Sequence, residues 1–202
     1  MNKLLINSLI CANILALNST FAATLYTEAN SGDLSNLPET PTSLGTLSLG
    51  QTIITGVLNE SGLPFAPDAF TFAVAADQVW TGLQIEVSTT GSQHFLAVDQ
   101  GTKAEQLASE LLIATLVSDV RNGVNILSVD NDGGSFGAQG TTAPLTGEDY
   151  TIWFQETTFD DAHNSYQIVD YTITLTTTLV PEPSTFPLIA LGILCVCTHR
   201  RR

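Results

Sequence analysis

Hydrophobic and polar residues alternate with a period of two in several stretches of this chain, and that pattern most restricts its fold. The clearest stretch, Val169 to Thr176, places Val, Tyr, Ile and Leu on one face and Asp and Thr on the other. Similar alternation covers 70–74, 83–88 and 150–155. Because successive side chains of a strand point to opposite faces, each stretch predicts a strand with one face in a core and one in water.

Shorter runs, bounded by Gly, Pro and Asn, predict further strands at 44–49, 52–58, 94–99 and 124–129. The turns recur about every 8–12 residues, which predicts an all-β fold, an antiparallel β-sandwich of jelly-roll type over residues 44–179. Residues 23–43 are rich in Ser, Gly, Asn and Pro and are expected to form an extended lead-in.

One segment breaks the strand pattern. From Thr102 to Leu116, the residues Leu107, Leu111 and Ala114 recur at helical spacing. Thr102, with Glu105 at the third position after it, has the form of a capping box. This segment is therefore predicted to be the one short helix of the domain.

The distribution of charge excludes one class of function. The 202 residues carry 20 acidic and 6 basic side chains, a formal net charge of −14. Between Ala23 and Val180 there are 19 acids and only two bases, Lys103 and Arg121, so this span carries −17. Nucleic-acid binding needs clustered Lys and Arg, so we expect no nucleic-acid partner. The acidic body is expected to stay soluble through self-repulsion.

The N-terminus, residues 1–22, has the organisation of a secretory signal peptide. Lys3 precedes a mostly apolar stretch from Leu4 to Leu17, and Thr20 and Ala22 place small residues at the −3 and −1 positions. We predict cleavage after Ala22, with the Sec machinery and signal peptidase as partners. An uncleaved anchor is the alternative; lipidation at Cys11 is disfavoured because the bulky Ile10 precedes it.

The C-terminus, residues 180–202, combines three features in a fixed order. Pro181, Glu182 and Pro183 come first, then an apolar run of 12 residues at 186–197, then Arg200, Arg201 and Arg202. A helix over that run spans about 18 Å, less than the roughly 30 Å hydrocarbon core, so it suits a transient membrane segment. The arginines are expected to stay cytoplasmic. A simple tail anchor is the alternative.

This tripartite C-terminus resembles the PEP-CTERM sorting signal. The resemblance implies export by Gram-negative bacteria that make extracellular polysaccharide. It also implies processing by an exosortase, a membrane-embedded, transpeptidase-like enzyme. The body has a weaker resemblance to the pre-peptidase C-terminal (PPC-like) β-sandwich, through Leu44 to Gly50, the Asp68-x-Phe70-x-Phe72 strand and Gly147 to Phe154. That family implies a non-catalytic accessory or adhesion module.

Cysteine usage agrees with this division. Cys11 lies in the leader, and Cys195 and Cys197 lie in the C-terminal apolar run. The body has no cysteine, so it has neither a disulfide framework nor a cysteine-based metal site.

The sequence around residues 130–135, Asp-Asn-Asp-Gly-Gly-Ser, is the densest polar constellation. Asp130 and Asp132 are candidate Ca²⁺ ligands, because hard cations need several oxygens and glycines let the chain wrap the ion. Asp160 and Asp161 are a second candidate source of ligands. The EF-hand pattern is not met, and a solvated acidic turn is the alternative. Calcium is the one cofactor that the sequence suggests.

Other chemistry has less support. Trp80 and Trp153 are candidates for stacking on sugar rings, with core packing as the alternative. Ser135 stands in a Gly-x-Ser-x-Gly pattern upstream of Asp160 and His163, but no helical sequence follows it, as a nucleophile elbow requires. His94 and His163 are far apart and lie in no zinc motif.

These observations predict an exported, non-enzymatic protein of the cell surface or extracellular matrix, such as a biofilm. A module that binds carbohydrate or exopolysaccharide is the first alternative. A secreted hydrolase is the second and the less favoured.

Overall fold

The computed structural model describes residues 22–58, 66–89, 92–118, 121–142, 144–157, 159–160 and 165–180. Short strands dominate these residues, as the sequence predicts. The elements are β1 (Ala22–Thr27), α2 (Glu28–Ser31), β2 (Thr42–Thr46), β3 (Gly50–Leu58), β4 (Asp68–Ala73), β5 (Gln78–Val87), β6 (His94–Gln100), the 3₁₀ turn η2 (Ala108–Glu110), β7 (Ile113–Val117), α3 (Ile126–Val129), β8 (Leu145–Thr146), β9 (Asp149–Glu156), β10 (Phe159–Asp160), β11 (Ser165–Tyr166) and β12 (Val169–Leu179).

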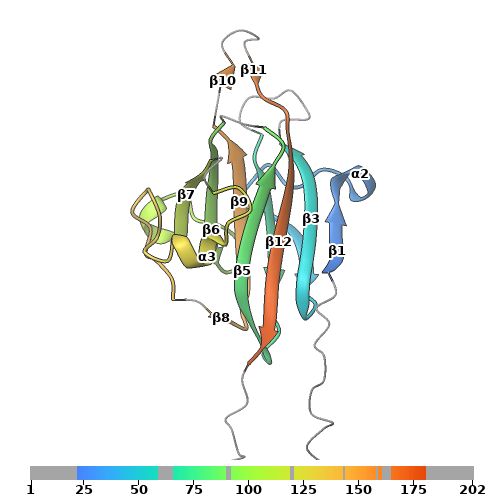
Figure 1. Ribbon diagram of the computed structural model, residues 1–202, viewed down its shortest axis with the longest axis vertical. Coiled ribbons are helices and arrows are strands. Elements are labelled where there is room, and N and C mark those ends of the chain that lie inside the picture. Colours follow the sequence, from blue (N-terminus) through green and yellow to red (C-terminus); the bar gives the residue numbers. More distant parts are fainter. Residues whose placement is uncertain are drawn as a thin grey trace, which may run out of the picture.

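Two five-stranded sheets pack face to face (Figure 1). Sheet A has the order β1-β3-β12-β5-β8, and sheet B has the order β2-β4-β9-β6-β7. Nearly every connection carries the chain from one sheet to the other. β10 and β11 form a small hairpin at the end of the sandwich opposite β8 (Figure 1). The predicted all-β sandwich is confirmed.

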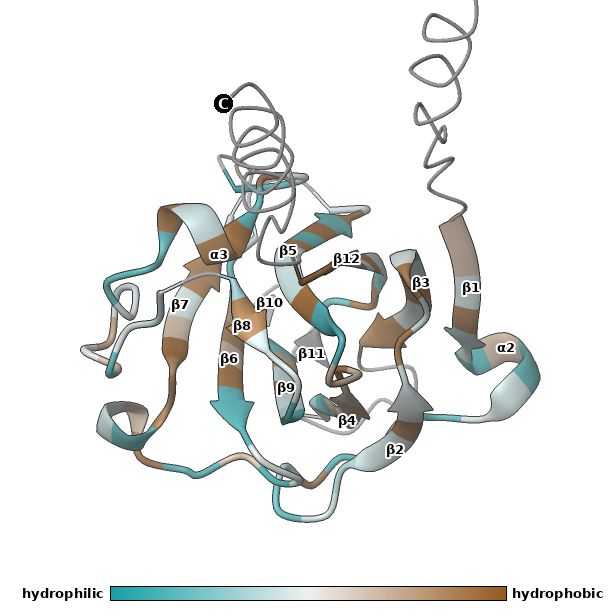
Figure 2. Cartoon of the chain, turned by 90° about the horizontal axis from the view of Figure 1, so that it is seen from below, coloured by the Kyte–Doolittle hydropathy of each residue, from teal (hydrophilic) through white to brown (hydrophobic). Residues whose placement is uncertain are grey.

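The core lies between the two sheets and is formed by the inward face of each strand. Along β3 and β12 every second residue is buried, and Figure 2 shows the corresponding alternation of hydrophobic and hydrophilic residues along the strands. The largest side chains of this core are aromatic: Phe72 packs edge-on against Trp80, and Phe154 packs edge-on against Tyr171. The period of two therefore predicted correctly which side chains enter the core.

The predicted antiparallel arrangement holds for the centre of each sheet but not for one edge of each. β1 pairs with β3 in parallel, and β2 pairs with β4 in parallel. β1 and α2 lie in the segment that was predicted to be an extended lead-in. That segment adds an edge strand to sheet A. It also contacts sheet B, through an isolated antiparallel bridge between Ser35 and Ala69.

The helix predicted over 102–116 is wrong. The described chain has only the single 3₁₀ turn η2 there, followed by β7, which pairs with β6. Ile113, Thr115 and Val117 are β-branched and fit a pleated sheet better than a helix. Leu111 and Ala114 pack with Ala97 on the outer face of sheet B, so the helical spacing of apolar residues came from a turn and a strand that cover one surface.

The strand predicted over 124–129 is also wrong, because residues 126–129 form the helical turn α3. Asn125 explains the difference. Its side-chain oxygen accepts a hydrogen bond from the Leu83 N–H (3.0 Å), and its amide donates to the Thr81 carbonyl (3.1 Å). These bonds satisfy β5 at a position where a paired strand would otherwise be needed.

Within the described residues, no helix is long and apolar enough to cross a membrane. The predicted membrane segment at 186–197 and the predicted signal peptide, apart from Ala22, lie outside the described residues.

Candidate metal centre

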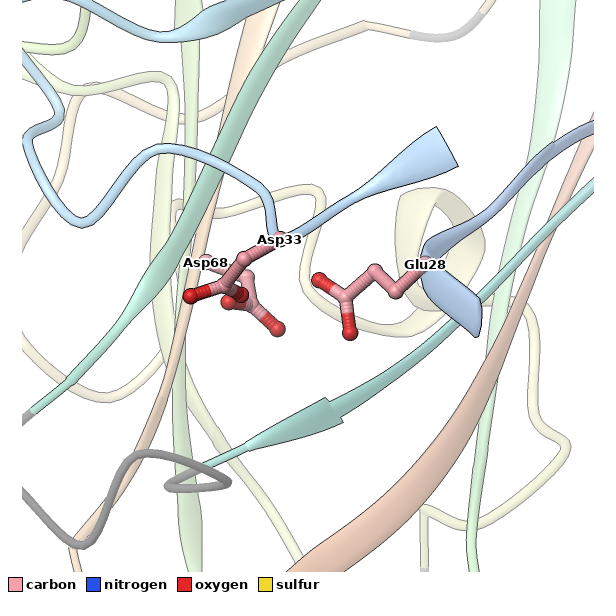
Figure 3. Close-up of side chains that lie close together, drawn as sticks. All are labelled: Glu28, Asp33 and Asp68. Atoms are coloured by element: carbon pink, nitrogen blue, oxygen red, sulfur yellow. The ribbon is translucent and has the colours of Figure 1, made fainter. Parts of the chain in front are cut away.

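Three carboxyl groups meet where the segment after β1 passes from sheet A to β4 of sheet B. Glu28 begins α2, Asp33 follows that helix, and Asp68 begins β4. One oxygen of each lies within 4.8 Å of the others (Figure 3). Glu28 and Asp68 are 6% and 2% exposed, whereas Asp33 faces solvent. We call these three residues the carboxylate cluster.

The segment that carries the cluster is held in place by backbone hydrogen bonds. The Glu28 carboxylate accepts N–H bonds from Leu34 (3.2 Å) and from Val57 in β3 (2.6 Å). The Ala69 N–H donates to the Ser35 carbonyl at 2.8 Å, which fixes the far end of the segment on β4. Residues 28–35, which we call the strap, therefore join the two sheets and carry two of the three carboxyl groups, Glu28 and Asp33.

A tyrosine and a glycine complete the surroundings of the cluster. Tyr171 on β12 is paired with Gly56 on β3, and its side chain enters the core. A Cβ atom at Gly56 would lie 2.3 Å from the Tyr171 hydroxyl oxygen and 2.6 Å from Glu28 Oε2. Only glycine leaves room for both oxygens at this position.

The electrostatics of the cluster are those of concentrated negative charge. Burial, and then the nearby carboxylates of Asp68 and Glu28, raise the pKa of Tyr171 well above its ordinary value. Burial and the same acids also raise the pKa of Tyr26. In the described part of the chain the two bases are engaged elsewhere, Lys103 with Glu105 (2.9 Å) and Arg121 with Asp130 (2.8 Å).

Two chemical arrangements can compensate such a cluster. The carboxyl groups can share protons, as closely spaced acids do, or their oxygens can ligate a hard cation. Glu28, Asp33 and Asp68 are the residues that would hold such a cation, each with one oxygen. Their oxygens are half or fewer of the six to eight that Ca²⁺ takes.

Sequence reasoning missed the cluster, although one of its members carried a signal. Asp68, Phe70 and Phe72 are every second residue of β4, so the alternation of side chains places the Asp68 carboxylate on the same buried face as the two phenylalanines. A buried acid on a strand needs a partner. Neither Glu28 nor Asp33 has such a signal, because Glu28 begins the single helical turn α2 and Asp33 follows it in a loop.

The residues predicted to bind calcium lie elsewhere. Asp130 is buried and its carboxylate is held by Arg121, so a cation there would compete with a guanidinium group. Asp132 is exposed and accepts the Gly134 N–H at 3.2 Å. Asp160 belongs to β10, and Asp161 lies outside the described residues. Calcium binding by this loop stays a prediction, to be tested by titrating Ca²⁺ against the Tm of the wild type and of Asp132→Asn.

The two tryptophans have different environments. Trp80 is wholly buried and its indole N–H donates to the Gly82 carbonyl at 2.7 Å, so its ring has no face open to a sugar. Trp153 lies on the outer face of sheet B, where it packs edge-on against Phe95, which in turn contacts the exposed Phe136. Of the two predicted sugar-stacking residues, only Trp153 belongs to an aromatic group near the surface.

An open, polar cleft of about 660 Å³ lies at one end of sheet B. Its lining is acidic and amide-bearing: Asp99, Gln100, Glu110, Gln139, Glu148 and Asp149, with Gly101 and Leu112. Gln100 donates to Glu148 across the cleft wall, and Asp99 is bonded to two backbone N–H groups. The cleft can offer hydrogen bonds to a hydroxyl-rich or cationic molecule.

A buried polar relay ties the β5–β6 loop to β9. The Ser92 hydroxyl is 3.0 Å from His94 Nε2, and His94 Nδ1 is 2.8 Å from Glu156 Oε2. Ser-His-carboxylate geometry of this kind activates serine nucleophiles. Here all three residues are buried and Ser92 is also bonded to Thr89 (2.6 Å), so a substrate carbonyl has no access. Of the predicted hydrolase residues, Ser135 lies in a described loop, whereas His163 lies outside the described residues.

The predicted delivery residues lie at the two limits of the described chain. Ala22, the predicted cleavage position, is the first residue of β1. The sorting residues Pro181, Glu182, Pro183 and Arg200 to Arg202 lie outside the described residues.

Comparison with family models identifies the C-terminus. Residues 179–202 match the PEP-CTERM protein-sorting motif. The fold and the motif together define an exported protein with a folded β-sandwich and a terminal sorting signal. The chain therefore carries a PEP-CTERM protein-sorting motif at its C-terminus, and this motif implies processing by an exosortase-type enzyme.

Solved structures with partial likeness are periplasmic inhibitors of g-type lysozyme called PliG. The Salmonella Typhimurium protein is 14% identical with a TM-score of 0.34, over 67% of this chain and 98% of its own. An Escherichia coli PliG mutant is 12% identical with a TM-score of 0.31, over 67% of this chain and 99% of its own. The Aeromonas hydrophila protein is 10% identical with a TM-score of 0.32, over 68% of this chain and 96% of its own. Similarity at these TM-scores supports no conclusion about the function of this chain. A search of curated protein sequences found no match.

Proposed function

We propose that this protein is a non-enzymatic component of the cell surface or extracellular matrix. A signal peptide cleaved after Ala22 exports it, and its PEP-CTERM signal anchors it transiently in the inner membrane until an exosortase-type enzyme acts on it. The observation that carries this proposal is the sorting motif at residues 179–202, directly joined to a folded, acidic, cysteine-free sandwich.

The body supports a binding or structural role over a catalytic one. In the described residues, the Ser92–His94–Glu156 relay is closed to substrate, and two of the three acids of the carboxylate cluster are buried. The described part of the body is strongly acidic, which favours solubility outside the cell and repulsion between copies.

Fractionation of the native host tests this proposal. The full chain and a chain that ends at Val180 are expressed from the same promoter, and the mass of each mature form is determined. We expect the full chain to reach the surface or the medium and the shortened chain to remain in the periplasm. A full-length form with an intact C-terminus that accumulates in the inner membrane would contradict sorting. A Pro181→Ala/Pro183→Ala chain, which keeps the apolar run and the arginines, separates loss of the motif from loss of the anchor.

A carbohydrate-binding module is the second candidate. It is favoured by the aromatic group Phe95, Phe136 and Trp153, which lies on the same outer face of sheet B as part of the polar cleft. Aromatic rings that stack on sugars and carboxylates or amides that bind hydroxyls commonly occur together in such sites.

The two tryptophans give this candidate a direct readout. Trp80 is buried and Trp153 is near the surface, so a change in fluorescence on adding polysaccharide reports mainly Trp153. Titration with a neutral glucan and with an acidic polysaccharide is expected to shift the emission, and Phe136→Ala is expected to weaken the response. No shift with either polymer would leave the structural role as the only candidate.

A further inference from the structure

The first and last described residues of the chain lie at the same end of the sandwich. Ala22 begins β1 and Val180 follows β12, and both strands have these ends beside the turn that leads into β3 (Figure 1). The register agrees, since Ala22 is opposite Gln51 and Thr177 is opposite Gly50. We call this end the terminal pole and define it by Ala22, Leu49, Asp77, Leu179 and Val180. The β10–β11 hairpin marks the opposite end.

The fold continues up to the sorting motif without a linker. Leu179 is still paired with Gln78 on β5, and the Val180 N–H donates to the Asp77 carbonyl at 2.9 Å. The next residue is Pro181, and only five residues, 181–185, separate the sheet from the apolar run that starts at Phe186. Fully extended, five residues span at most about 17 Å.

The terminal pole exposes apolar side chains. Leu49, Leu179 and Val180 are 48%, 53% and 42% exposed. Leu49 precedes Gly50 and Leu179 follows Thr177, and Gly50 and Thr177 form the last pair of the β3–β12 register. The Thr177 hydroxyl also donates to the Ser48 carbonyl (2.9 Å). Asp77 and Glu148 are exposed beside this surface, so it is apolar at its centre and acidic at its border.

We propose that the terminal pole is a membrane-contacting surface that rests on the lipid headgroup region while the sorting signal is inserted. This inference depends on the proposed insertion of the apolar run. The short tether holds Leu49, Leu179 and Val180 close to the bilayer, and partial burial of these side chains among headgroups is favourable. The acidic border favours neutral, zwitterionic lipid over anionic lipid.

The length of β12 makes the orientation measurable. Its 11 residues span about 36 Å at 3.3 Å per residue, roughly twice the reach of the tether. Ile168, just before β12, is 63% exposed and lies at the opposite end, so it is the matched control for Leu49. The body has no cysteine, so single cysteines can be introduced without background once the native ones are replaced by serine.

The experiment uses the exported chain with its C-terminal signal, reconstituted into phosphatidylcholine vesicles. Three versions carry one fluorescent label each, at Leu49→Cys, at Ile168→Cys or at the native Cys195. Quenching by spin-labelled headgroups is measured for all three, and an unchanged Tm confirms that the exposed substitutions leave the fold intact. We expect the label at 49 to be quenched severalfold more than the label at 168, with less quenching when anionic lipid is added.

The label at Cys195 separates the two possible failures. If it is in the hydrocarbon while the labels at 49 and 168 are quenched equally, the membrane-contacting surface is refuted and the sorting proposal stands. The same equal quenching is expected if the terminal pole contacts a processing enzyme instead of lipid, because the vesicles contain no enzyme. If the label at Cys195 remains in water, the proposed insertion fails, and the orientation fails with it.

Discussion

Two carboxyl groups in this protein are equally buried, but one faces a positively charged group and the other faces further carboxyl groups. Asp68 and Asp130 are each 2% exposed. Asp130 faces the guanidinium group of Arg121 at 2.8 Å, whereas Asp68 faces the carboxyl groups of Glu28 and Asp33. The comparison shows that a chain with two bases in its body cannot pair each buried acid with a cation, and that the remaining acids must be compensated in another way.

The largest expected effect comes from breaking the paired member of this comparison. Arg121→Ala leaves the buried carboxylate of Asp130 without its cation, so we expect the free energy of unfolding at pH 7 to fall by about 3 kcal/mol. Burial raises the pKa of Asp130 above its ordinary value. The deficit should shrink as the pH falls through that raised pKa, because protonated Asp130 needs no cation.

Denaturant unfolding of both proteins at several pH values measures this deficit. Lys103→Ala is the control, since its pair with Glu105 is exposed and its loss should leave stability unchanged. Equal stability of Arg121→Ala and the wild type at pH 7 would show that the ion pair does not compensate Asp130.

The second prediction crowds the carboxylate cluster. Gly56→Ala places a methyl group 2.3 Å from the Tyr171 hydroxyl and 2.6 Å from Glu28 Oε2, so both side chains or the β3 backbone must move. We expect a loss of about 1–3 kcal/mol in the free energy of unfolding, typical of overpacking. Tyr171→Leu in the same chain removes both the hydroxyl oxygen and the ring carbon Cζ, which lies 2.5 Å from the added methyl group, so it should make the loss caused by Gly56→Ala smaller. Additive effects of the two substitutions would contradict the close approach.

The third prediction uses the buried tyrosines. Burial, and then Glu148, raise the pKa of Tyr150 to about 12, whereas an unfolded tyrosine ionises near pH 10. As the pH rises, the unfolded state therefore loses the Tyr150 proton before the folded state does. The contribution of Tyr150 to the free energy of unfolding is complete below pH 10 and declines as the pH rises toward 12. We expect this group to contribute a decline of about 1–2 kcal/mol, after allowance for solvent screening.

Tyr150→Phe should remove that part of the alkaline decline, and Tyr171→Phe should remove a separate part, because the cluster acids also raise the pKa of Tyr171. Unfolding at pH 9 and pH 11 measures both contributions. A wild-type stability that is flat over this range would contradict buried, protonated tyrosines.

The smallest expected effect relieves repulsion among the carboxyl groups that surround Asp68. Asp33 is exposed, and its carboxylate approaches the other two within 4.8 Å. In the presence of a chelator, Asp33→Asn should raise the free energy of unfolding by about 1 kcal/mol at low salt and less at high salt. Asp170→Asn, an exposed acid on β12, is the control. A lower stability for Asp33→Asn would show that its charge has a favourable partner.

Much of the sandwich was predictable because strand periodicity is local. The sequence predicts the buried face of β12 from its alternation, and the residues of that face are buried in the structure: Val169, Tyr171, Ile173 and Leu175. The failures lie at 102–116 and 124–129. There the sequence alone could not show that Ile113 to Val117 would pair with β6, or that the Asn125 side chain would satisfy β5.

The candidate site was less predictable than the fold. The sequence directed attention to Asp130 and Asp132, which are close together in the chain, while the structure gathers Glu28, Asp33 and Asp68 from two separate segments. The acids of the strap have no strand periodicity, so their positions depend on how the strap joins the two sheets. The difference between Trp80 and Trp153 has the same cause, since both lie in strands but only one faces the core.

Three features can be read from the amino-acid sequence alone: the alternating faces of the strands, the excess of acids over bases and the terminal sorting motif, which family comparison confirms. These are properties of composition and of residues close together in the chain. The meeting of three acids beside Tyr171 and the position of Ala22 and Val180 at one pole, by contrast, follow from the tertiary structure. Both depend on which strands pair and in which register, and pairing between distant segments is set by the packing of the whole core.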